Sequence, residues 1–338
     1  MADFLTSTHR DRWIFTVQDL VEKASAANAR AVQALQQHGA TRVEIQPDGS
    51  LAYPGSENGA PSKLPEPLKI EEELFIRRYY EHKIQQVCGA FSFPNKIQAT
   101  AVLYFKRFYL SWSVMEHDPK HIMLTCIYIS CKVEEFHVSA EELGKGIQQD
   151  HQVILKNELT LLQGLNFDLI VYAPYRSLDG FVLDIQKWAD AAKDENVSQK
   201  ILDLQSEAIR KVDAMLLTDC PLLFPPGQLA LAALRSANVQ ERAIDMEKYL
   251  RGVCERQQQK HSYSELVGML NQIAALVDAA RTPIEEEVRR IDRKLKFCRN
   301  PGLQDESKKR DRKGKHKSKR TPQQETISPM VMGDTARA

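Results

Sequence analysis

The sequence predicts an all-α protein built from two consecutive five-helix units. From Leu68 onward almost every segment repeats its apolar residues at helical spacing, and the alternation typical of β-strands is nearly absent. The third helix of each unit is expected to begin at a proline, Pro119 or Pro226, and these lie 107 residues apart. Apolar residues coincide at this offset in three pairs: Ile122 with Leu229, Leu124 with Leu231, and Ile127 with Leu234. Two helix sets in matching order therefore favour an internal repeat.

Length and composition indicate a globular protein with two domains and a separate charged tail. The chain has 338 residues, of which 43% are hydrophobic and 27% charged. Its 46 Lys and Arg nearly balance its 45 Asp and Glu. This balance excludes a protein whose whole surface is basic and binds phosphate groups. Nine basic residues and one Asp fall within Lys308–Arg320, so the rest of the chain carries a formal charge of −7.

The sequence argues against a membrane protein, a secreted protein and an enzyme. The longest apolar-leaning stretch, Ile122–Cys131, is about half the ~20 residues that a spanning helix needs. Asp3, His9, Arg10, Asp11 and Arg12 lie within the first twelve residues, where a signal peptide would require an apolar run. Six cysteines form no C-x-x-C pair, and no phosphate-binding loop, dinucleotide fingerprint or metalloprotease motif occurs. We therefore expect reduced thiols in an intracellular compartment, and no metal, cofactor or catalysis by this chain.

A first helix precedes the two units. Thr16 and Asp19 form a capping-box pattern that starts it, and Gly39 provides a stop after His38. Residues 39–67 then contain four Gly and five Pro, which predicts an exposed linker.

Helix-start residues and apolar spacing place the helices of both units. In the first unit we expect helices over 71–90, 95–110, 119–133 (capped by Asp118), a shorter one from Ser139, and 150–165. In the second we expect them near 177–192, 197–218, 226–238, 243–254 and 262–280.

A last helix is expected over 282–300, with Thr282 as its cap and Pro283 at its first position. Its apolar stripe must pack either on the body or on a partner; it consists of Ile284, Val288, Ile291 and Leu295. Residues 301–338 are polar and expected to be disordered.

Two charged residues stand out within the first unit. The third helix is apolar around its whole circumference until Lys132, whose simplest interpretation is a cation favoured by the helix dipole. On a helical projection of 150–165, Glu158 falls in the middle of the apolar arc. A carboxylate there is costly unless it is paired or hydrogen-bonded. Either this face is partly open and binds something, or Glu158 has an internal partner.

Several stretches of the first unit resemble the first cyclin box. They are Tyr104–Leu110, Ser113–Met115, Ile122–Cys126, Cys131–Phe136 and Leu162–Leu169. Three sequence motifs are similar to those of the H-type members of the cyclin family: Ser-Val-Met-Glu, Leu-Asn-Phe-Asp-Leu-Ile-Val and Pro-Tyr-Arg. The resemblance is strong over about 70–180, extends into the second unit and to Arg12–Phe15, and omits the linker and tail. It implies two cyclin-box repeats, over 68–172 and 173–281, flanked by an N-terminal segment and helix (1–38) and a C-terminal helix.

The resemblance also implies a binding site for a kinase. Cyclins use a Lys at the end of the third helix and a Glu in the fifth to hydrogen-bond the backbone of a kinase's mobile helix. The matching positions here are Lys132 and Glu158, and Glu134, Glu135 and Phe136 continue the same rim. Solvated acids are the alternative interpretation of Glu134 and Glu135. A substrate-docking patch found in many cell-cycle cyclins is matched poorly by Ile76–Tyr80.

By this resemblance the chain is a regulatory subunit of a cyclin-dependent kinase of the CDK-activating type. That kinase would phosphorylate activation loops of other kinases and the C-terminal repeats of RNA polymerase II. A third assembly subunit and general transcription factor H are further implied partners. The competing class is a TFIIB-like transcription adaptor, but the acidic body and missing zinc ribbon argue against direct nucleic-acid binding. Lys308–Arg320 is interpreted as a nuclear localisation signal, or else as a solvated charge run; the cytoplasm is a second possible compartment.

Overall fold

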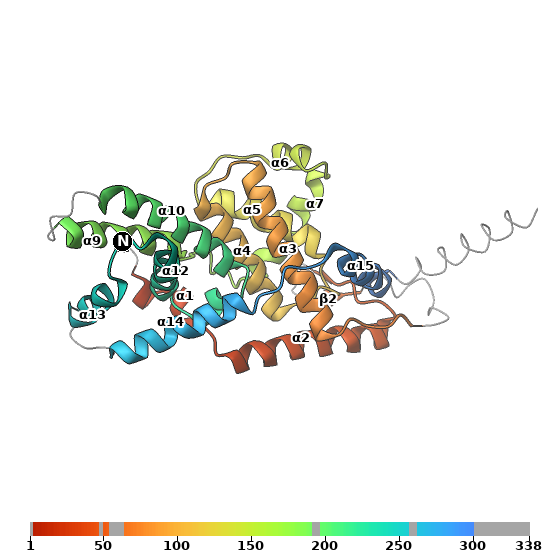
Figure 1. The fold of residues 1–338 in the computed structure, drawn as a ribbon. Coiled ribbons are helices and arrows are strands. Elements are labelled where there is room, and N and C mark those ends of the chain that lie inside the picture. The colour runs from red at the N-terminus through yellow and green to blue at the C-terminus, as the bar shows by residue number, and fades with distance from the viewer. Residues whose placement is uncertain (1–2, 47–49, 54–63, 191–196, 257–261, 301–338) are drawn as a thin grey trace, which may run out of the picture.

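The structure is a computed structural model that describes residues 3–46, 50–53, 64–190, 197–256 and 262–300. Within these ranges almost all regular structure is helical, which confirms the predicted fold class (Figure 1). The exception is an antiparallel hairpin of β1 (Glu44–Ile45) and β2 (Leu51–Ala52). None of the helices described here is long and apolar enough to cross a membrane.

The N-terminal segment contains more structure than the sequence predicted. A 3₁₀ helix, η1 (Phe4–Thr6), and helix α1 (Thr8–Trp13) precede the expected long helix, α2 (Val17–His38). The ends of α2 are as predicted: Thr16 and Asp19 form a reciprocal capping box, and Gly39 adopts a left-handed conformation with φ 73°. Local sequence signals therefore determine both ends of α2.

The first unit follows the predicted order, with one break. Its helices are α3 (Ile70–Ala90), α4 (Asn95–Ser111), α5 (Pro119–Val133), α6 (Ala140–Gly146), α7 (His151–Lys156) and α8 (Glu158–Gly164). Asp118 and Ser139 cap α5 and α6 as expected. The single helix predicted over 150–165 is wrong, because the chain interrupts it at Asn157, with φ −94° and ψ 0°. Sequence spacing alone did not reveal this break.

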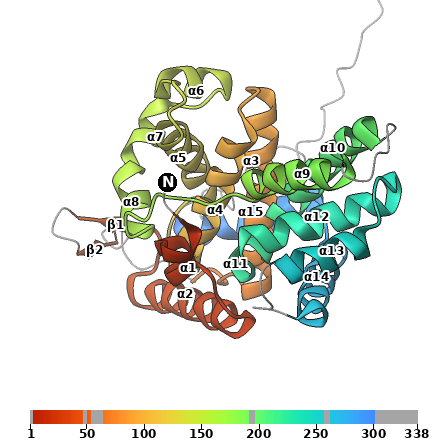
Figure 2. The same ribbon diagram turned by 90° about the vertical axis from the view of Figure 1, so that its left-hand side faces the viewer.

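The second unit lies beside the first (Figure 2). It consists of α9 (Pro174–Asp190), α10 (Val197–Leu216), α11 (Cys220–Leu223), α12 (Pro226–Glu241), α13 (Met246–Arg256) and α14 (Tyr263–Asp278). The short helix α11 was not predicted; the other five agree with the expected set to within a few residues. The domain boundaries proposed from the sequence remain a prediction.

Two charged residues of α4 lie inside the first unit. Lys106 is 2% exposed and its Nζ lies 2.6 Å from Oε2 of Glu81 on α3, so the charge is paired. Arg107 is fully buried, with its guanidinium 4.8 Å from the ring centroid of Trp13. These two cations therefore join α4 to neighbouring elements.

The described parts of the predicted linker are not uniformly exposed. Ala40, Thr41 and Val43 are buried. Thr41 donates through Oγ1 to the Met115 carbonyl at 2.7 Å and through its backbone N–H to the Cys298 carbonyl at 3.0 Å. The expectation of an exposed linker was wrong here because these contacts come from residues more than 70 positions away.

The last helix, α15 (Glu285–Arg299), packs on α3 and so belongs to the body (Figure 1). Val288, Ile291 and Leu295 are buried as the stripe predicted, whereas Ile284 is 67% exposed. The predicted start at Thr282 and Pro283 was wrong: Ile284 is still extended, and the helix begins at Glu285 without a side-chain cap. Only the helical part of the stripe can face α3.

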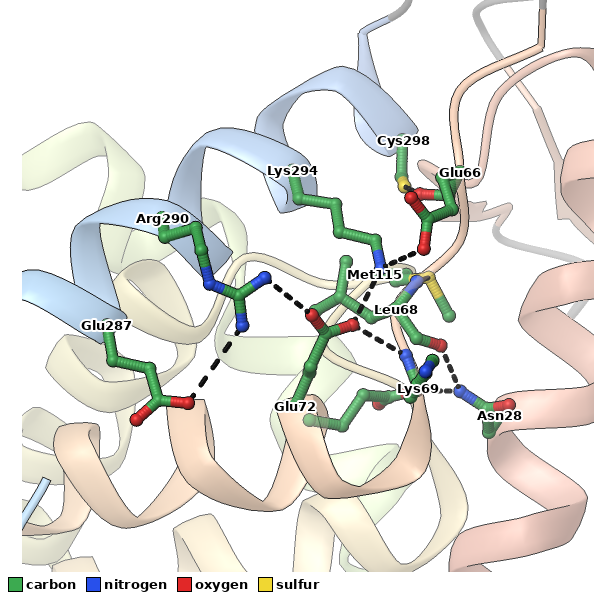
Figure 3. A network of polar contacts seen from close by, with 11 residues as sticks. Asn28, Glu66, Leu68, Lys69, Glu72, Met115, Glu287, Arg290, Lys294 and Cys298 are labelled. Carbon is green, nitrogen blue, oxygen red and sulfur yellow. Dashed lines mark hydrogen bonds and ion pairs between the residues drawn. The ribbon is translucent and has the colours of Figure 1, made fainter.

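Ion pairs hold α15 against the start of α3 (Figure 3). Lys294 Nζ lies 2.7 Å from a carboxylate oxygen of Glu72 and 2.9 Å from one of Glu66. Arg290 contacts the other Glu72 oxygen at 3.2 Å. Glu72 also accepts the Lys69 backbone N–H at 2.9 Å, so one carboxylate both caps α3 and anchors α15.

The N-terminal segment contacts both units (Figure 2). His9 is 2% exposed, and its Nδ1 accepts the Tyr172 backbone N–H at 3.0 Å. Trp13 donates through Nε1 to Asp168 at 3.1 Å. Further along, Phe15 donates its backbone N–H to the Leu222 carbonyl in α11 at 2.7 Å. The segment thus joins the end of the first unit to the second unit.

Acid should weaken this attachment through His9. Burial, together with the charge of Arg107, lowers the pKa of His9 from 6.5 to about 3. Below pH 6.5 His9 therefore binds a proton in the unfolded chain but not in the folded chain. The folded state loses stability as the pH falls toward 3. At pH 5 this should cost about 2 kcal/mol of unfolding free energy.

Urea unfolding of wild type and His9→Asn from pH 7.5 to 4.5 would measure this effect. Asparagine keeps an acceptor near the Nδ1 position and does not titrate. The wild type should lose more stability than the variant between these limits. Parallel pH profiles would contradict the assignment.

Candidate functional site

Lys132 and Glu158 lie together at the surface of the first unit. Lys132 is in the last turn of α5 and Glu158 begins α8. The Lys132 Nζ is 2.5 Å from Glu158 Oε1 and 4.7 Å from the ring centroid of Tyr128. The two side chains remain 46% and 27% exposed. Both interpretations of Glu158 therefore apply: it has an internal partner, and its face is partly open.

The break at Asn157 positions Glu158. Asn157 Nδ2 donates to the Val153 carbonyl at 2.7 Å, which satisfies an acceptor at the end of α7. Helix α8 then starts anew, with Glu158 as the acidic residue of its first turn. A carboxylate is favoured at a helix N-terminus, just as Lys132 is favoured at the C-terminus of α5.

Lys132 keeps its charge in partly apolar surroundings. Partial burial opposes the charge of Lys132, but the hydrogen bond and ion pair with Glu158 outweigh it and raise the pKa of Lys132. Leu155 and Leu159, on α7 and α8, are 37% and 56% exposed. This surface therefore offers ammonium donors, a carboxylate acceptor and exposed apolar side chains to a partner.

Glu134 is turned toward α4. Its Oε1 accepts from Thr100 Oγ1 at 2.8 Å and its Oε2 lies 3.7 Å from Lys96 Nζ. Lys96 also donates to the Glu134 carbonyl at 2.8 Å, beyond the end of α5. Glu134 is thus held in place by α4 rather than simply solvated.

Glu135 and Phe136 end α5 in a Schellman motif. The Phe136 N–H bonds to the Cys131 carbonyl at 2.8 Å and the Glu135 N–H to that of Lys132 at 3.3 Å. Glu135 has φ 56°, a conformation that favours glycine, and is exposed. Phe136 packs edge-on against Phe93 with ring centroids 5.5 Å apart. The aromatic residue fixes the turn, and the turn projects Glu135 outward.

Sequence reasoning missed several contributors to this surface. Tyr128 could have been found, because it lies one helical turn before Lys132 on α5. No local sequence pattern predicts the contacts of Lys96 and Thr100 with Glu134, because these residues are 38 and 34 positions away from it. Of the poorly matching patch Ile76–Tyr80, the first two residues, Ile76 and Arg77, are buried.

Comparison with known families identifies the fold. Residues 62–170 match the family model "Cyclin, N-terminal domain", and residues 173–278 match "Cyclin C-terminal domain". The chain belongs to the cyclin family. This confirms the resemblance found in the sequence, including its extension into the second unit.

The relatives of this cyclin include H-type members from distant organisms. It is 54% identical to Cyclin-H1-1 of Arabidopsis thaliana, over 92% of this chain and 93% of that protein. It is 36% identical to Cyclin-H of Xenopus laevis, over 73% and 77% of the two chains.

Solved structures share the fold. A chain of the CAK complex of Chaetomium thermophilum bound to ATP-gamma-S aligns with TM-score 0.71 and 21% identity, covering 95% of this cyclin and 98% of that chain. A chain of the yeast TFIIK (Kin28/Ccl1/Tfb3) complex aligns with TM-score 0.62 and 25% identity, covering 81% and 100%.

Replacing Glu135 by glycine should stabilise the free cyclin. A left-handed residue with a Cβ is strained, and glycine removes that strain, so Glu135→Gly should raise the unfolding free energy by roughly 0.5–1 kcal/mol. Chemical denaturation would measure the change. Glu135→Ala is the matched control, because it removes the carboxylate and keeps the Cβ. Equal stability of the two variants would exclude backbone strain as the cause.

Proposed function

We propose that this cyclin is the activating subunit of a cyclin-dependent kinase of the CDK-activating type. Two similarities support this: the H-type relatives, and the TFIIK complex whose named components are Kin28, Ccl1 and Tfb3. The chain is also 33% identical to yeast Cyclin CCL1, over 66% of its own length and 54% of that protein. Its kinase would phosphorylate activation loops of other kinases and the C-terminal repeats of RNA polymerase II.

The observation that carries the proposal is the exposed Lys132–Glu158 pair. Lys132 has three N–H donors and Glu158 two carboxylate oxygens, so the pair retains bonding capacity after satisfying itself. Lys132 would donate to backbone carbonyls of the kinase's mobile helix, and Glu158 would accept its N–H groups. Leu155 and Leu159 would exclude water around these bonds.

Activation would follow from a shift in population. The cyclin must bind the kinase with its mobile helix turned inward more tightly than with the helix turned outward. The inward position completes the kinase's own Lys–Glu ion pair, which orients the ATP phosphates. The catalytic groups would belong to the kinase, and this chain would regulate them.

The rim after α5 would extend the contact. Glu135 is exposed on a strained turn, and Phe136 is partly buried behind it. Glu134 would act through the position of this turn, which it secures by its bonds to Thr100 and Lys96. Glu135 and Phe136 would contact the kinase directly.

Assembly with a third subunit and with general transcription factor H follows from the same similarities. The yeast complex contains Tfb3 beside its kinase and cyclin. The TFIIB-like adaptor is the weaker alternative, because both matched family models are cyclin domains.

Exchanging the two charged residues would test the site. The double variant Lys132→Glu/Glu158→Lys can still form the internal ion pair, and reversing the charge at each of the two helix ends costs only about 0.3–1 kcal/mol, so it should still fold. It would nevertheless present each charge to the wrong backbone group. We expect activation of a CDK-activating-type kinase toward polymerase repeat peptide to fall at least roughly tenfold.

The control exchanges an exposed pair on α15, Arg289→Glu/Glu285→Arg, which lies outside the proposed interface. This variant should activate normally. Full activation by the Lys132/Glu158 exchange would limit that pair to a structural role. Failure of the wild type to bind or activate the kinase would refute the function itself.

Nuclear localisation is the remaining part of the proposal. Its candidate signal, Lys308–Arg320, lies outside the described residues, so the support is the density of basic residues in the sequence. Replacing the nine basic residues by Gln should lower the nuclear-to-cytoplasmic ratio of a fluorescently tagged full-length chain. Deleting residues 323–338 leaves the basic run intact and should not lower the ratio. Unchanged nuclear accumulation of the Gln variant would remove this signal.

A further inference from the structure

A cavity of about 640 Å³ lies between the N-terminal segment and the second unit. Its volume is within the roughly 300–1,000 Å³ range of ligand-binding pockets. The walls come from η1 and α1 on one side and from α9, α12, α13 and α14 on the other. They are mainly apolar, with Phe4, Leu5, Ile14, Phe181, Leu231 and Met269 among the lining residues.

Two polar side chains in these walls have unused bonding capacity. Among the described residues that line the cavity, Arg10 is the only charged one; one of its guanidinium nitrogens donates to the Leu5 carbonyl at 2.6 Å. No carboxylate among the described residues pairs with Arg10. Within the same ranges, the buried Oε1 of Gln228 has no hydrogen-bond partner. A buried acceptor without a donor is costly, so a ligand that supplies an N–H would relieve it.

We propose that this cavity binds a short segment of a partner protein, in which an acidic residue neighbours bulky apolar residues. The carboxylate would pair with Arg10, the apolar side chains would fill the cavity, and a backbone N–H would reach Gln228. A fatty acid would satisfy the first two groups and leave Gln228 unpaired. The combination of a cation, an apolar cavity and an unpaired acceptor therefore favours a peptide.

The lining residues also suit a peptide of variable sequence. Leu5 is 58% exposed, so apolar surface continues from the cavity to its rim. Met269 is an unbranched side chain that can adapt to different apolar partners. We expect recognition of a short pattern, an acidic residue beside apolar residues, rather than of one unique sequence.

This site is separate from the proposed kinase interface. The cavity is built by α1, α9 and α12–α14, whereas Lys132 and Glu158 lie on α5 and α8 of the first unit. The inference does not rest on the proposed function. Kinase activation and peptide binding can therefore be lost independently.

The experiment selects peptides from a random dodecapeptide display library with the full-length cyclin. Enriched peptides are synthesised, labelled, and titrated against wild type, Arg10→Gln and Met269→Trp by fluorescence polarisation. Tryptophan at 269 fills the cavity without adding charge. We expect enriched peptides to carry Asp or Glu beside Leu, Phe or Met. Met269→Trp should abolish binding, and Arg10→Gln should weaken it about tenfold, as for loss of a charge-assisted bond.

Arg12→Gln is the matched control: it is on the same helix, pairs with Asp168 and does not line the cavity. It should leave peptide affinity unchanged. Thermal unfolding and kinase activation of every variant would verify the fold, and Arg10→Gln keeps the test valid if Met269→Trp unfolds. The proposal is overturned if no peptide is enriched, or if Arg10→Gln leaves the peptide affinity unchanged. It is also overturned if radiolabelled laurate binds the cavity and the peptides do not.

Discussion

The apolar circumference of α5 is the constraint on which the first unit depends. Residues 122–127 and 129–131 are buried, so other helices must cover α5 on every side, as α3, α4, α7 and α8 do. A charge within this stretch would be buried without water. Beyond Cys131 the helix leaves the core, and Lys132 is exposed where the helix dipole also favours a cation. The position of the proposed kinase-binding lysine is thus set by the core.

Structural features that depend on residues close together in the sequence were predictable. The ends of α2 and the starts of α5 and α6 use caps only a few residues from the helices that they begin or end. The start of α15 was mispredicted although Thr282-Pro283 is a good local signal. Here the stripe from Val288 to Leu295 and the ion pairs to α3 fix the helix, and Ile284 remains outside it. Tertiary contacts therefore overrode a local preference.

The candidate site was predictable in part. The position of Glu158 in an apolar arc indicated an unusual carboxylate, but a helical projection contains no information about a partner 26 residues away. The same projection assumed a continuous helix, whereas Asn157 interrupts it. The N-terminal contacts were beyond sequence reasoning, since Trp13 and His9 reach residues 155 and 163 positions further on. Such long-range pairs have no periodic signal.

The N-terminal segment connects the two units of this cyclin. It is anchored to Asp168 and Tyr172, at the end of the first unit, and to Leu222 in the second. The same segment supplies Phe4, Leu5 and Arg10 to the cavity. A peptide that requires those residues can bind only while the segment is attached, so by linkage its binding must stabilise the attachment. Because the attachment contacts both units, peptide binding would also stabilise the contacts between the segment and each unit.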